Sequence, residues 1–128
     1  MAAINPIKID PNGATVFCAV ASNPLTVTRY TLVRFDLPDG ASQKRIKNNA
    51  RPDPKARIEL GEPSDWIGKA VLQCAADVAR NPASGDSTWR LALRFYQGSS
   101  KVGEVELNGD FGADKLVAPE INCRLTKQ

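Results

Sequence analysis

Turn signals divide this chain into short apolar runs. Gly or Pro stands beside Asn or Asp at short intervals, from Pro11-Asn12-Gly13 to Asn108-Gly109-Asp110. Within several runs apolar and polar side chains alternate, as they do in a strand with one buried face. Short strands at regular spacing are typical of antiparallel sheets packed into a sandwich or barrel. The pattern predicts an all-β protein, a β-sandwich of about seven to eight mostly antiparallel strands.

The clearest half-buried strand is expected at residues 89–95. Its apolar positions alternate with more polar ones and are Trp89, Leu91, Leu93 and Phe95. A turn at residues 97–100 would close a hairpin onto residues 102–107, where Glu104 and Glu106 share one face. In that hairpin, Arg90 and Arg94 would form cross-strand ion pairs with the two glutamates.

Further strands are expected at residues 7–9, 14–21, 26–37 and 121–125. In the run at 26–37, apolar side chains gather on the odd positions, which include Val27, Val33 and Phe35. Successive side chains of a strand point to opposite faces. These odd positions are therefore expected to share one face of the strand.

Residues 65–80 fit two different structures. Ile67, Val71, Cys74 and Val78 recur at helical spacing, and Asn81-Pro82 would end a helix. The same segment also alternates as a strand, with one face formed by Ala70, Leu72, Cys74, Ala76 and Val78. The strands predicted on both sides favour a strand within a β-meander. An α+β fold with one helix at 65–80 is the alternative.

The composition is that of one ordinary domain over residues 1–128. Hydrophobic residues make up 42% of the 128 residues and charged residues 24%, which suits a packed core rather than a disordered chain. The chain contains no histidine. Histidine is the commonest general base, the usual partner of a Ser or Cys nucleophile and a frequent zinc ligand. We therefore expect no enzymatic activity, no cofactor and no metal site.

The three cysteines, Cys18, Cys74 and Cys123, each lie within an apolar run. Their odd number argues against a complete disulfide framework, so buried free thiols are the favoured interpretation. Cys74, Trp89 and Cys123 loosely follow the Cys…Trp…Cys order of immunoglobulin domains. That order makes an immunoglobulin-like architecture possible and leaves a Cys74–Cys123 disulfide as the alternative.

The expected location is the cytoplasm, with no membrane contact. The start of the chain lacks the charged and apolar regions of a signal peptide. No apolar stretch approaches the roughly 20 residues that span a bilayer. Free thiols are typical of a reducing compartment.

The main charge feature is a basic segment at residues 44–57. Six basic residues and one acid give it a charge of +5, whereas the rest of the chain has 11 basic and 13 acidic residues, or −2. Its Asn and Pro residues predict an exposed loop. This loop could bind nucleic acid or another polyanion, or it could simply improve solubility and shield a sheet edge. The candidate binding residues are Lys44, Arg45, Lys47, Arg51, Lys55 and Arg57.

Two aromatic residues suggest a carbohydrate site. An exposed Trp66, together with Tyr96, could stack against a sugar ring. The favoured interpretation of Trp66, however, is an anchor that holds its loop onto the core.

The sequence thus predicts a non-enzymatic binding or assembly module that acts through loops and sheet edges. A protein partner or self-assembly is the first expectation. Binding of nucleic acid or another acidic surface through residues 44–57 is the alternative, and carbohydrate binding is the second alternative.

Overall fold

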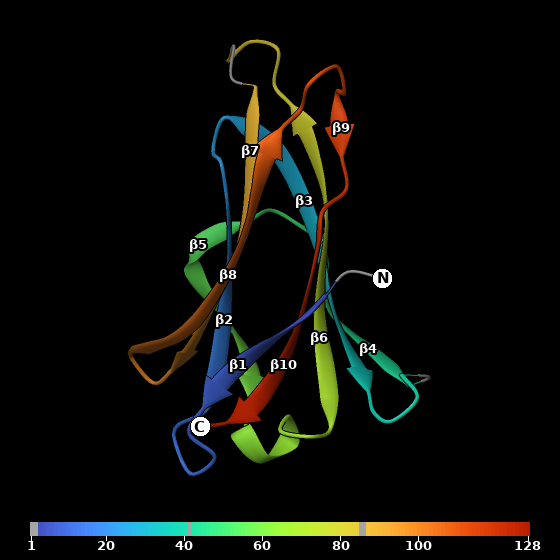
Figure 1. The fold of residues 1–128 in the computed structure, drawn as a ribbon. Coiled ribbons are helices and arrows are strands. Elements are labelled where there is room, and N and C mark those ends of the chain that lie inside the picture. The colour runs from blue at the N-terminus through green and yellow to red at the C-terminus, as the bar shows by residue number, and fades with distance from the viewer. Residues whose placement is uncertain (1–2, 41, 85–86) are drawn as a thin grey trace.

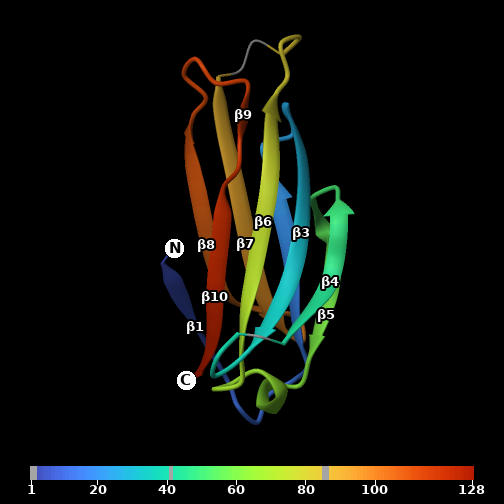
Figure 2. The same cartoon turned by 90° about the vertical axis from the view of Figure 1, so that its right-hand side faces the viewer.

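The computed structural model describes residues 3–40, 42–84 and 87–128, which form two facing β-sheets (Figures 1 and 2). The six-stranded sheet has the order β1(Ile4–Ile9), β10(Glu120–Lys127), β6(Ala70–Arg80), β3(Thr26–Asp36) and β4(Gln43–Ala50), and the short β9(Leu116–Val117) pairs with β6. The four-stranded sheet has the order β5(Asp53–Gly61), β2(Val16–Ser22), β7(Thr88–Gln97) and β8(Ser100–Asp110). Paired strands are antiparallel, except that β1 runs parallel to β10. The predicted β-sandwich is confirmed.

The strand order differs from that of an immunoglobulin domain. In the four-stranded immunoglobulin sheet A-B-E-D, both edge strands, A and D, precede their neighbours B and E in the chain. In the four-stranded sheet here, both edge strands, β5 and β8, follow their neighbours β2 and β7. The alternative Cys74–Cys123 disulfide is also wrong, because all three cysteines are free and buried.

The strand interpretation of residues 65–80 is confirmed for β6, and the helix is wrong. β6 pairs with β3 on one side and with β10 on the other. Its even-numbered residues, from Ala70 to Val78, are buried between the two sheets. Pairing on both sides and burial of one face outweigh the helix propensity of its alanines. β6 does not continue into a meander, because β7 belongs to the other sheet.

β3 buries even-numbered residues, and Val33 on the other face is also buried. Thr28, Tyr30 and Leu32 lie in the interior, whereas Val27 is 56% exposed. This strand carries apolar residues on both faces, so alternation alone could not identify the inner one. The other strands meet their predictions: Ile7 and Ile9 of β1 and Ile121, Cys123 and Leu125 of β10 are buried.

Large side chains close both ends of the sandwich. Near one end, the 3-10 turn η1(Pro63–Asp65) leads to Trp66, which is 1% exposed and donates its Nε1–H to the carbonyl of Leu60 at 2.9 Å. At the other end, buried Phe111 follows β8, and its backbone N–H donates to the carbonyl of Ser87 at 2.8 Å. Within the described ranges, no helix is long and apolar enough to cross a membrane.

Candidate functional site

The basic segment is not the loop that was predicted but two edge strands, joined at Arg51-Pro52. β4 is the edge of the six-stranded sheet and β5 that of the four-stranded sheet, and both lie on the same side of the sandwich (Figure 2). The polar and Pro residues that suggested a loop are accommodated at irregularities. Asn49 has a φ of 50°, and the pairing of β5 with β2 shifts register between Cys18 and Val20. Edge strands tolerate such interruptions because only one side is paired.

All six basic candidates are exposed on these two strands and their link. Among the described residues, none of the six forms an ion pair with an acid. The hydrogen bonds of their side chains go to neutral groups: Arg45 donates to Asn48 Oδ1 at 3.4 Å, and Arg57 donates to the carbonyl of Gly98 at 2.8 Å. The six line the two edge strands and their link, and no acid in the described part of the chain pairs with them. We call this set the basic strip: Lys44, Arg45, Lys47, Arg51, Lys55 and Arg57.

Arg57 extends the basic strip onto the outer face of the four-stranded sheet. Its guanidinium carbon lies 4.1 Å from the centroid of the Tyr96 ring, in a cation–π contact. One face of Tyr96 is therefore already covered. The aromatic residue serves here to position a cation.

A hollow of about 380 Å³ adjoins the basic strip, where the turn between β2 and β3 meets Arg51-Pro52. Two guanidinium groups line it, those of Arg29 and Arg51, and neutral polar groups come from Ser22, Thr26 and Asn81. No acidic residue of the described ranges lines it. Guanidinium, hydroxyl and amide donors suit an oxyanion such as phosphate. We call this the Arg29–Arg51 hollow; sequence reasoning missed it because Arg29 is distant from residues 44–57 in the chain.

The carbohydrate hypothesis loses the two aromatics on which it was based. Trp66 is buried, and the guanidinium carbon of Arg34 lies 4.6 Å from the centroid of its ring. The anchor interpretation of Trp66 is confirmed, and its role as an exposed binding residue is wrong. Trp66 lies inside the core, and Arg57 covers one face of Tyr96. The two aromatic residues therefore do not form a common exposed surface.

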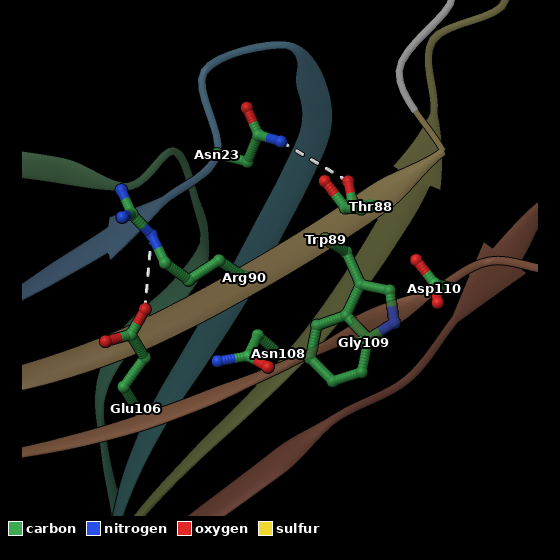
Figure 3. A pocket seen from close by; sticks show the side chains of 8 residues that line it. All are labelled: Asn23, Thr88, Trp89, Arg90, Glu106, Asn108, Gly109 and Asp110. Atoms are coloured by element: carbon green, nitrogen blue, oxygen red, sulfur yellow. Dashed lines mark hydrogen bonds and ion pairs between the residues drawn. The ribbon is translucent and has the colours of Figure 1, made fainter.

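A different tryptophan lies at a second hollow, of about 470 Å³, at one end of β7 and β8 (Figure 3). The indole of Trp89 packs against Gly109, where an added Cβ would stand 3.0 Å from its Nε1. Arg90 and Glu106 in the same lining form an ion pair at 3.6 Å. The paired charges leave this hollow less suited to a polyanion than the basic strip.

The predicted cross-strand ion pairs of the β7–β8 hairpin are confirmed. Arg94 Nε lies 2.6 Å from Glu104 Oε1, and Arg90 Nε lies 3.6 Å from Glu106 Oε1. The hydrogen bond from Arg94 lowers the pKa of Glu104. These four residues stabilise the hairpin locally, in contrast to the cations of the basic strip.

Comparisons with protein-family models, with curated proteins and with solved structures found no match for this chain.

Proposed function

We propose that this protein is a non-enzymatic binding module that holds a nucleic-acid backbone against the basic strip. The observation that carries the proposal is the exposure of six cations, none with an acidic partner in the described part of the chain. Repulsion among such cations is relieved when they contact phosphates, and bound counterions are released from the nucleic acid.

The basic strip has features beyond those needed to protect the two edge strands from unwanted strand addition. Lysine, proline and irregular pairing on an edge strand prevent unwanted strand addition, and β4 and β5 show all three. One arginine, however, acts away from the free edges: Arg57 reaches over Tyr96 of β7. This position supports a ligand surface that continues from the strip onto the four-stranded sheet.

The mode of contact follows from the residue types. The strip itself contains no aromatic side chain, and Tyr96 beside it is capped by Arg57. Base stacking is therefore a minor contribution, and phosphate contacts dominate. We expect weak dependence on nucleotide sequence and strong dependence on salt.

The test is fluorescence anisotropy of a labelled single-stranded oligonucleotide at several salt concentrations. The variant Arg51→Gln/Lys55→Gln/Arg57→Gln removes three cations from the strip. Each phosphate contact of a single strand contributes about −0.7 to the slope of log K against log salt, so the slope should become shallower by about 2. The affinity at low salt should fall at least tenfold, an estimate of about 1.4 kcal/mol or more in binding free energy.

The matched control is Lys8→Gln/Arg124→Gln/Lys127→Gln, which changes the net charge equally on β1 and β10, at the far edge of the six-stranded sheet. We expect this variant to retain most of the affinity and the slope. Equal losses of affinity in the two triple variants would show that net charge, and not the position of the cations, determines binding. Salt-independent binding of the wild type would overturn the proposal outright.

A further inference from the structure

The outer face of the six-stranded sheet is sorted into rows of similar chemistry. In register across β3, β6 and β9, one row consists of Val27, Ala79 and Leu116. Val27 and Leu116 are 56% and 58% exposed, so an apolar row lies open at one end of the sheet.

The other end of the same face is also apolar. Phe35 and Val71 are neighbours in register, and with Ile4 and the Leu37-Pro38 turn they line a hollow of about 360 Å³. Large apolar residues on the open face of a sheet are unusual in a monomer and mark contact surfaces.

The rows between these ends contain polar residues and both signs of charge, beside the apolar Val33 and Ala75. Arg29 of β3 stands in register with Asp77 of β6, and one row further along Glu120 of β10 stands in register with Ala75. Neither Arg29 nor Glu120 forms an ion pair within the described part of the chain. The base lies on the β3 side of β6 and the acid on the β10 side.

From this sorting we infer that the protein forms a two-fold dimer in which the outer faces of two six-stranded sheets pack together, with the axis parallel to β6. Such an axis places each row of one subunit opposite the same row of the other subunit. It also places the β3 side of one sheet opposite the β10 side of its partner. Val27 then meets Leu116 of the partner subunit, and Arg29 comes beside the partner's Glu120. The two copies of Asp77 meet at the axis, flanked by the two copies of Arg29 that stand in register with them. Phe35 comes opposite the partner's Arg124, a favourable cation–π pairing.

The size of the face fits a stable dimer. β6 has 11 residues, so at about 3.3 Å per residue the face is about 36 Å long, and with side chains about 20 Å wide. It offers about 700 Å² per copy, close to the roughly 800 Å² that each partner buries in a standard-size interface. Two sheets packed face to face are also an ordinary arrangement in β-sandwich proteins.

The test is the solution mass of the full chain, measured by light scattering over a range of concentrations. We expect a dimer of the 13.8 kDa chain that dissociates on dilution. Val27→Glu and Leu116→Glu should each weaken dimerisation at least about tenfold. Ser99→Glu, at the exposed tip of the β7–β8 hairpin on the other sheet, is the matched control and should leave the dimer unchanged.

Charge reversal tests the orientation of the axis. Arg29→Glu alone and Glu120→Arg alone should each weaken the dimer, and the double variant should restore it, because each reversed charge meets its reversed partner. Circular dichroism of every variant verifies that the sheet still forms. A monomer at all concentrations, or a dimer unaffected by both Val27→Glu and Leu116→Glu, would overturn the inference.

Discussion

The three thiols show how position in the sandwich determines chemistry. Burial raises the pKa values of Cys74 and Cys123 to about 12, and burial raises the pKa of Cys18 as well, with a smaller contribution from the nearby Cys74. The thiolate is the reactive form, so these cysteines are inert in the folded protein.

We predict that a thiol reagent at pH 8 modifies no cysteine of the native protein and three after denaturation. The raised pKa values also link stability to pH: the contribution is complete below the ordinary thiol pKa of about 8.5 and is lost as the pH rises towards 12. Denaturant unfolding at pH 7 and pH 10 measures this loss. Replacing all three cysteines by alanine should reduce the pH dependence; if the full dependence persists, the thiols are not its source.

Among the elements, β1 of one sheet packs closely against β8 of the other. A Cβ added at Gly103 of β8 would stand only 2.8 Å from Cγ2 of Ile7 in β1. Glycine is therefore required by close packing at this edge. The opposite edge of the sandwich, formed by β4 and β5, is free to carry the basic strip.

We predict that Gly103→Ala lowers the free energy of unfolding by about 1–3 kcal/mol through overpacking. In an Ile7→Ala background the clashing methyl is absent, so the penalty of Gly103→Ala should largely vanish. A double-mutant cycle from denaturant unfolding measures this coupling. Equal penalties in both backgrounds would show that strand propensity, not the contact with Ile7, is responsible.

For the whole molecule, the proposed dimer covers Arg29 and leaves the basic strip open, so the strip binds without the Arg29–Arg51 hollow. An axis parallel to β6 places the β4 edge of one copy near the β1 edge of its partner, so the two basic strips lie on opposite sides of the dimer. Such a dimer is bivalent and can bridge separate strands of nucleic acid.

Long single-stranded nucleic acid should therefore form large complexes with the wild-type protein, detected by light scattering, whereas an oligonucleotide of about 10 nucleotides should not. Leu116→Glu should abolish the large complexes and retain binding of the oligonucleotide. Loss of both would mean that the two surfaces are not separate, and large complexes formed by a monomeric Leu116→Glu variant would contradict bridging through the dimer.

Much of the fold could be predicted from alternation along the chain. The β7–β8 hairpin, its ion pairs and the inner face of β10 each depend on contacts close in sequence or on an unambiguous apolar face. Alternation identified the strand β3 but not its inner face, because both faces are apolar. The loop predicted at residues 44–57 was wrong, because polar and Pro residues suit an edge strand as well as a loop.

The sequence by itself determined that the protein is a β-sandwich with free buried cysteines and that its excess positive charge lies in residues 44–57, because alternation and local charge are properties of neighbouring residues. Only the tertiary structure decided the strand order, the outer face of β3 and the meeting of Arg29 with Arg51 at one hollow. Those features depend on which strands pair across long chain separations, and pairing is set by the packing of the whole core.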